Sequence, residues 1–163
     1  MPVAYILVGL PGVGKSTWID NQTFDWDRTV VASTDNYVEK IAQSVGKTYS
    51  EVFERVMSNA VHEMASDVKR AVEHGYDIVW DQTSLTVDTR SRKLRMLPDS
   101  YKCIAVVFAP PGAEEHLRRL SNRPGKHIPQ AVIDRMRGQF VMPTLAEGFD
   151  RVVYADLINI GEQ

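Results

Sequence analysis

The chain is poor in cysteine, in net charge and in long apolar runs. One cysteine among 163 residues, Cys103, excludes an internal disulfide, and its apolar surroundings predict a small buried side chain. A formal net charge of −2 does not indicate an overall attraction to nucleic acid. The longest apolar runs, near 3–10 and 103–111, are too short to span a membrane. The start, Met1-Pro2-Val3, lacks the basic segment of a signal peptide, so we expect a cytoplasmic protein.

The length and the ordinary composition predict a single domain over residues 1–163, since no linker or repeat divides the chain. Apolar β-like segments alternate with helical segments, which is the pattern of an α/β fold with a mostly parallel sheet flanked by helices. We expect about five strands, near 3–8, 29–33, 77–80, 102–108 and 151–154. Helices are expected near 15–22, 35–45, 50–74, 87–96, 113–122 and 129–140.

Residues 9–16 read Gly-Leu-Pro-Gly-Val-Gly-Lys-Ser, the pattern of a phosphate-binding P-loop. The motif lies between a predicted strand and a predicted helix, where its glycines let backbone N–H groups point at a phosphate. We expect Lys15 to reach the β- and γ-phosphates of ATP and the Ser16 hydroxyl to ligate Mg²⁺. A glycine-rich turn that binds nothing is the alternative. The expected nucleotide-binding residues are Gly12, Val13, Gly14, Lys15, Ser16 and Thr17.

Two aspartates follow predicted strands on the edge where open α/β sheets bind ligands. Asp35 can accept the proton of an acceptor hydroxyl as a general base, or it can cap the helix that follows. Asp81 lies at the position where an aspartate holds Mg²⁺ or its water. Gln82 follows Asp81 where motor ATPases place a glutamate, and the sequence has no Asn-Lys-x-Asp motif. Both absences favour a kinase over a motor ATPase or a GTPase switch.

A cationic Pro/Gly loop lies between the two predicted helices near 113–122 and 129–140. It fits a mobile lid, around 118–129, that closes on ATP and brings cations to the transferred phosphoryl group. A solvated basic loop is the alternative. The basic residues concerned are Arg118, Arg119, Arg123 and Lys126.

A second basic run lies on the helix after Asp81. It offers either a docking face for a phosphodiester backbone or an ordinary exposed helix face. We expect His116 at the surface, and Trp18, Trp26 and Trp80 in the core. The second run consists of Arg90, Arg92, Lys93 and Arg95.

With these residues, the chain resembles the kinase domain of phage polynucleotide 5′-kinases within the wider P-loop kinase family. The resemblance covers most of the chain. It implies that Asp35 is the general base, that Arg119 and Arg123 stabilise the transferred phosphate, and that Lys15 and Ser16 serve the P-loop. The motifs that carry it are GLPGVGKSTW at 9–18, STDNY at 33–37, DQTSLT at 81–86 and RRLSNRPGKHIP at 118–129.

One position departs from the family pattern. Val38 stands where phage polynucleotide kinases carry an arginine that contacts the phosphate of the acceptor nucleotide. The departure concerns recognition of the acceptor and leaves the residues of phosphoryl transfer in place.

We therefore expect an ATP- and Mg²⁺-dependent kinase that phosphorylates a hydroxyl of DNA or RNA, with a polynucleotide 5′-hydroxyl as the leading acceptor. A kinase of hydroxymethylated bases in DNA, such as 5-hydroxymethyluracil, is an alternative that Val38 makes more credible. A nucleoside or nucleotide kinase and a non-catalytic NTP-binding regulatory module are further alternatives. The resemblance implies a phage-encoded protein in the host cytoplasm, with no membrane contact. The oligomeric state stays open.

Overall fold

A computed structural model describes residues 1–161 and contains one five-stranded sheet in the order β2-β3-β1-β4-β5. Every strand pairs in parallel with its neighbours. The predicted α/β fold is confirmed, and each strand lies within one residue of its expected bounds. The strands are β1 (Val3–Val8), β2 (Thr29–Ala32), β3 (Asp77–Trp80), β4 (Lys102–Val107) and β5 (Arg151–Tyr154).

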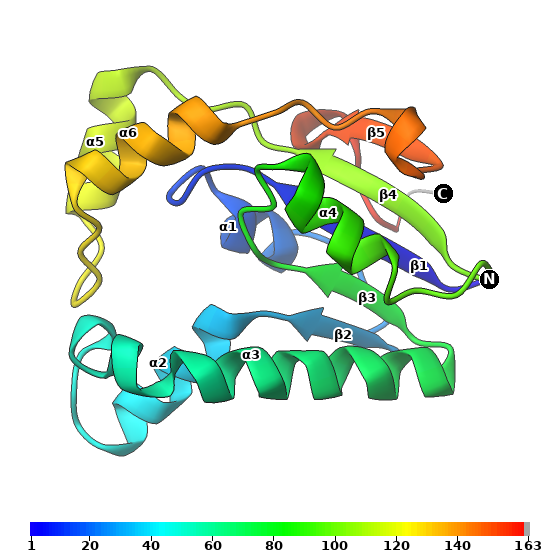
Figure 1. Ribbon diagram of the computed structural model, residues 1–163, viewed down its shortest axis with the longest axis horizontal. Coiled ribbons are helices and arrows are strands. Elements are labelled where there is room, and N and C mark those ends of the chain that lie inside the picture. Colours follow the sequence, from blue (N-terminus) through cyan, green and yellow to red (C-terminus); the bar gives the residue numbers. More distant parts are fainter. Residues whose placement is uncertain (162–163) are drawn as a thin grey trace.

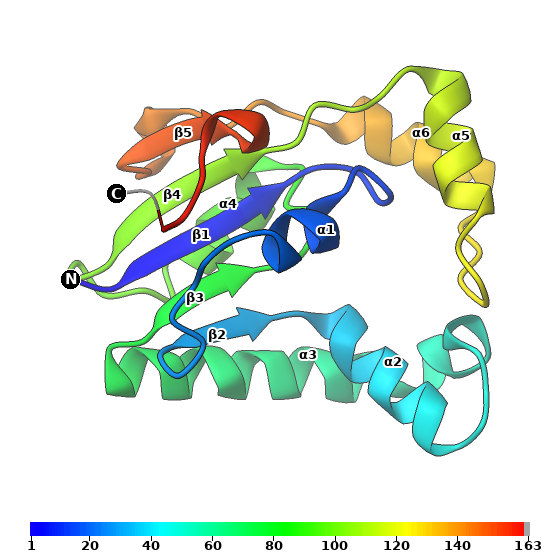
Figure 2. The same ribbon diagram turned by 180° about the vertical axis from the view of Figure 1, so that it is seen from behind.

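Helices cover both faces of the sheet. Figure 1 shows α4 in front of the sheet, and Figure 2, from behind, shows α1 on the opposite face. The lid helices α5 and α6 lie beyond the carboxyl ends of the strands (Figure 1). The helices are α1 (Lys15–Asp20), α2 (Thr34–Ser44), α3 (Tyr49–His74), α4 (Val87–Leu94), α5 (Ala113–Ser121) and α6 (Gln130–Gln139), with 3₁₀ turns at Leu145–Glu147 and Ala155–Leu157.

The core divides into two layers because side chains alternate along each strand. Ile6 and Val8 of β1 point to the face where Val68 of α3 packs. Leu7 points to the other face and packs in a cluster with Trp18 of α1. This double burial of the central strands explains why their sequences read as continuous apolar runs.

A third apolar cluster joins α2 to α3. Val38 and Ala42 of α2 pack against Val52 and Val56 of α3. The turn between the helices ends in a capping box, in which the side chains of Thr48 and Glu51 each accept a hydrogen bond from the other's backbone N–H. This corner of the molecule, residues 34–56, is therefore held both by packing and by a fixed helix start.

The prediction of an exposed basic face on α4 is wrong for two of the four residues concerned. Arg90 is fully buried and forms a two-pronged ion pair with Glu147, at 2.8 and 2.9 Å. It also donates to the carbonyls of Ser84 and Val141, each at 3.0 Å. Lys93 is buried above the Trp80 ring, and burial lowers its pKa to about 8. Because these two cations face the interior, α4 does not present a continuous basic surface to a phosphodiester backbone.

Two other side chains differ from expectation in their exposure. Trp26 is 52% exposed, whereas Trp18 and Trp80 are buried as predicted. His116, expected at the surface, is 1% exposed. The neighbours that bury His116, Pro11 and Arg137, are distant in sequence, so the local pattern does not contain the information.

Cys103 lies in β4, between β1 and β5, and is 7% exposed. Burial raises the pKa of its thiol to about 11, and the charge of Asp150 acts in the same direction. The predicted small buried side chain is confirmed. Within residues 1–161, no helix has both the length and the apolar character needed to cross a membrane.

The Arg90–Glu147 pair generates a stability prediction. Glu147→Ala leaves a buried guanidinium without its carboxylate, and we expect a loss of about 3–5 kcal/mol of unfolding free energy. The matched control is Asp88→Ala, which removes the exposed partner of Arg92, and should change stability by less than about 1 kcal/mol. Chemical denaturation measures both variants. Similar small losses in the two would contradict the structural role of the buried pair.

Candidate active site

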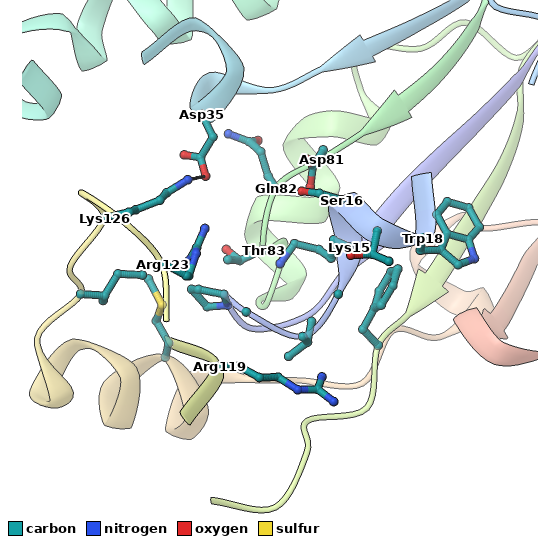
Figure 3. Close-up of a pocket in the computed structure, with 18 of the residues that line it drawn as sticks. Lys15, Ser16, Trp18, Asp35, Asp81, Gln82, Thr83, Arg119, Arg123 and Lys126 are labelled. Carbon is teal, nitrogen blue, oxygen red and sulfur yellow. Dashed lines mark hydrogen bonds and ion pairs between the residues drawn. The ribbon is translucent and has the colours of Figure 1, made fainter. Parts of the chain in front are cut away.

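A large pocket lies at the carboxyl edge of the sheet, between the P-loop, the α2–α3 corner and the lid (Figure 3). Its volume is about 1780 Å³. A pocket for one small ligand usually has roughly 300–1,000 Å³, so there is room for a donor and an acceptor together. The predicted site residues all line it: Lys15, Ser16, Asp35, Asp81, Arg119 and Arg123.

The P-loop curls because two of its glycines adopt left-handed backbone conformations. Gly12 has φ +74° and Gly14, the N-cap of α1, has φ +100°. A Cβ at Gly12 would also meet the Leu120 side chain of α5 at 3.0 Å. Glycine is therefore required at Gly12 both for backbone conformation and for the close packing of the lid helix.

Lys15 lies folded against the P-loop. Its Nζ donates to the carbonyls of Gly9 and Leu10, at 3.0 and 2.8 Å. Burial lowers the pKa of Lys15 to about 8, while the charges of Asp81 and Asp35 oppose the shift. A buried ammonium of this kind gains most from a strongly anionic partner, which a nucleotide phosphate would supply.

Ser16 and Asp81 are the candidate ligands for Mg²⁺, and Figure 3 shows them on the same side of the pocket. In the described part of the chain, neither the Ser16 hydroxyl nor the Asp81 carboxylate makes a side-chain hydrogen bond, so both have free oxygen lone pairs. Burial raises the pKa of Asp81, and the nearby positive charge of Lys15 opposes this. A hydroxyl and a carboxylate facing a phosphate site fit Mg²⁺, which takes few protein ligands beside phosphates and water.

Asp35 is not the cap of α2. Ser33 is the N-cap, and its hydroxyl accepts from the backbone N–H of Asn36 at 3.2 Å. The Asp35 carboxylate instead accepts from the Tyr49 hydroxyl and from Lys126 Nζ, each at 2.7 Å. Burial alone would raise the pKa of Asp35, but the hydrogen bonds from Lys126 and Tyr49 outweigh it and lower the pKa below its usual value. The carboxylate is thus ionised at neutral pH and able to accept a proton.

The tip of the lid contacts the α2–α3 corner. The backbone N–H of Ser50 donates to the Gly125 carbonyl at 3.1 Å, and the His127 N–H donates to the Ser50 hydroxyl at 3.2 Å. Lys126, between these contacts, reaches Asp35 and also Glu39, at 3.1 Å. The sequence predicts that Lys126 belongs to the lid but indicates no partner for it, since nothing in the local pattern links residues so far apart.

Two arginines of the lid, Arg119 and Arg123, lie in different environments. Arg119 is ion-paired with Glu115 at 2.7 Å, and Figure 3 shows it across the P-loop from Asp35. Arg123 extends toward the space between Asp35 and Lys15, and its charge lowers the pKa of both groups. Within residues 1–161, Arg123 has no salt-bridge partner. The structure therefore brings Arg123, and not Arg119, to the side of the pocket that holds Asp35.

His116 connects the lid to the P-loop, a role that the sequence did not reveal. Its Nε2 lies 2.7 Å from the Pro11 carbonyl, and its Nδ1 lies 2.8 Å from the guanidinium of Arg137 in α6. Because arginine only donates, Nδ1 accepts and the Nε2–H donates to Pro11. Both lid helices are thus tied through one buried imidazole to the loop that would hold the phosphates.

Comparison with known families agrees with this geometry. A family model described as an AAA domain matches residues 5–143. The chain belongs to this family. This family is a P-loop kinase family. Membership agrees with the observed site, in which the P-loop faces a carboxylate and a cationic lid.

Solved structures share the fold of this AAA-domain chain at low sequence identity. A provisionally assigned kinase from Chloroflexus aurantiacus J-10-fl aligns with TM-score 0.69 and 18% identity, over 97% of this chain and 89% of that one. A chain of the Pnkp1/Rnl/Hen1 RNA repair complex aligns with TM-score 0.63 and 21% identity, over 85% of this chain and 43% of that one. Shikimate kinase from Aquifex aeolicus gives TM-score 0.52 and 15% identity, over 96% and 89%.

The depressed pKa of Lys15 predicts how ATP affinity depends on pH. Phosphates bind the charged ammonium, so affinity should be constant below about pH 8 and fall by up to tenfold per pH unit above it. Calorimetric titration with ATP between about pH 7 and 9.5 measures this. Lys15→Arg is the control, because a guanidinium stays charged throughout and should flatten the profile. The same alkaline loss in both proteins would assign the titration to another group.

The separation of the lid arginines predicts different kinetic effects. If the pocket transfers a phosphoryl group, Arg123→Ala should lower kcat by roughly 10²–10³-fold, because it removes a cation from the space between Lys15 and Asp35 where charge would develop in the transition state. Arg119→Ala should act mainly on KM for ATP, because its side chain lies across the P-loop from Asp35. Steady-state kinetics with varied ATP distinguishes the two. An equal loss of kcat in both variants would contradict this separation, because it would mean that Arg119 acts on the transition state as Arg123 does.

Proposed function

We propose that the protein transfers the γ-phosphoryl group of ATP to a hydroxyl of a nucleic acid, with a polynucleotide 5′-hydroxyl as the leading acceptor. The observation that carries the proposal is that Lys15, Asp35 and Arg123 line one pocket at the carboxyl edge of the sheet. The P-loop kinase family and the shared fold of an RNA repair complex chain support it. A non-catalytic NTP-binding module would have no need of an ionised carboxylate facing the lid.

The reaction requires a base for the acceptor and cations for the donor. Asp35 takes the proton of the acceptor hydroxyl as its oxygen bonds to the γ-phosphorus, and the bond from that phosphorus to ADP breaks. Lys15 and Arg123 offset the charge on the transferred group and on the leaving ADP. Ser16 and Asp81 would hold Mg²⁺, which supplies further neutralisation of phosphate charge when bound.

A specific observation favours the hydroxymethylated-base alternative, or a free nucleoside, as a second candidate. Val38 is fully buried in the α2–α3 cluster, so the position where the phage enzymes carry an acceptor-phosphate arginine does not reach the pocket. The aromatic side chains of Tyr49 and Phe53 line the pocket on this side. Such a wall suits recognition through a base better than recognition through flanking phosphates.

A transfer screen with radiolabelled ATP tests the proposal. The acceptors are 5′-hydroxyl DNA and RNA oligonucleotides, DNA that contains 5-hydroxymethyluracil, nucleosides and nucleotides. Labelled 5′-ends support the leading acceptor, and label confined to hydroxymethylated bases or to nucleosides selects the second candidate. Failure to label any of them, in a protein shown to bind ATP, would contradict the proposal.

Asp35→Asn provides the mechanistic prediction. Turnover should fall by roughly 10²–10⁴-fold, because the amide cannot accept the proton. The melting temperature should fall only modestly, because Ser33 rather than Asp35 caps α2 and the amide oxygen can still accept a hydrogen bond from Tyr49 or Lys126. Asp27→Asn, at an exposed position before β2, is the matched control and should retain full turnover. Near wild-type turnover in Asp35→Asn would remove Asp35 from the role of base.

A further inference from the structure

The Asp35 carboxylate is held at both of its oxygens by side chains from two different elements. Tyr49, from the start of α3, donates its hydroxyl to Oδ1 at 2.7 Å. Lys126, from the lid, donates to Oδ2 at 2.7 Å (Figure 3). A carboxylate with both oxygens engaged has a fixed orientation, but a base must leave one oxygen to its substrate.

Tyr49 is the fixed partner of the two. It follows the capping residue Thr48 directly, so its backbone is set by the capping box. Its ring packs against Phe53 with centroids 5.5 Å apart. The buried cluster that joins α2 to α3 fixes the helix that carries Tyr49 relative to the helix that carries Asp35. The phenol hydroxyl is therefore positioned by contacts within the α2–α3 corner itself.

Lys126 is the partner that can leave. It belongs to the lid turn and already shares its ammonium with Glu39, 3.1 Å from its Nζ. Its Nζ also lies 4.2 Å from the centre of the Tyr49 ring. These two contacts stay with the ammonium when it moves off Oδ2, so its release does not strand a buried charge.

We propose that Tyr49 is a positioning residue for Asp35, and that the acceptor hydroxyl replaces Lys126 at Oδ2. The inference rests on the proposed function in one respect, that Asp35 is the base. Tyr49 keeps its own proton throughout and holds Oδ1. The acceptor proton passes to Oδ2, the acceptor oxygen bonds to the γ-phosphorus, and ADP departs. Lys126 remains beside Glu39, close to the charge that the transfer moves.

Tyr49→Phe tests the positioning role because it removes only the hydroxyl. With a 5′-hydroxyl oligonucleotide, kcat should fall about tenfold or more while KM for ATP is unchanged. The acid limb of the pH–rate profile should move to higher pH, because the ionised carboxylate loses a donor. The matched control is Tyr37→Phe, on α2 in the same apolar cluster, which should alter neither quantity. A lower melting temperature in Tyr49→Phe, with kcat and the pH–rate profile both unchanged, would overturn the proposal.

A second readout needs no acceptor. NMR titration of the Asp35 side-chain carboxyl carbon should give a higher midpoint in Tyr49→Phe than in the wild type. Equal midpoints would overturn the positioning role. A shifted midpoint in a protein that phosphorylates none of the screened acceptors would support the positioning role of Tyr49. It would then contradict only the proposed function.

Lys126→Met tests the replacement step. Without the ammonium, the acceptor no longer competes for Oδ2, so KM for the 5′-hydroxyl oligonucleotide should fall or stay level. A rise of tenfold or more in that KM would overturn this step, because it would make Lys126 a direct contact of the acceptor. Lys47→Met, at an exposed position of the α2–α3 turn, is the matched control for loss of one positive charge.

Discussion

Parallel pairing of neighbouring strands is the constraint on which the site depends. β1 pairs with β3, and β3 pairs with β2, all in the same direction. The segments that follow these strands therefore leave the sheet at one edge, and they carry Lys15, Asp81 and Asp35. No local interaction joins these three residues; the hydrogen-bond register of the sheet brings them together. A shift of one strand by a single residue would turn its side chains to the other face.

The charges in the pocket depend on one another. Burial penalises the Lys15 ammonium, and the carboxylates of Asp81 and Asp35 offset part of that penalty. Lys126 and Tyr49 in turn keep Asp35 ionised. The lid is thus part of the electrostatics of the site as well as its cover, because its Lys126 is one of the two partners of the Asp35 carboxylate.

The fold and the phosphate side of the pocket could be predicted from the sequence because their signals are local. Apolar runs, helix periodicity and the P-loop each occupy a few consecutive residues. Arg90 is an example of what local patterns do not predict. In the sequence it resembles part of an exposed basic face, but Glu147, 57 residues later, pairs with it and makes its burial possible. Tyr49 and His116 belong to the same class, since their roles come from hydrogen bonds to Asp35 and Pro11 in other elements. Long-range partners of polar side chains have no periodic signature.

The position of Cys103 allows opening of the core to be measured separately from movement of the lid. This single thiol lies in β4 inside the sheet, is not among the residues that line the pocket, and has its pKa raised by burial. A thiol reagent reaches it when the apolar cluster between the sheet and α3 opens, whereas Lys126 and Asp35 do not belong to this cluster. The rate of thiol modification thus reports the opening of the core. Comparing that rate with and without ATP would show how much nucleotide binding stabilises the sheet, independently of any lid movement.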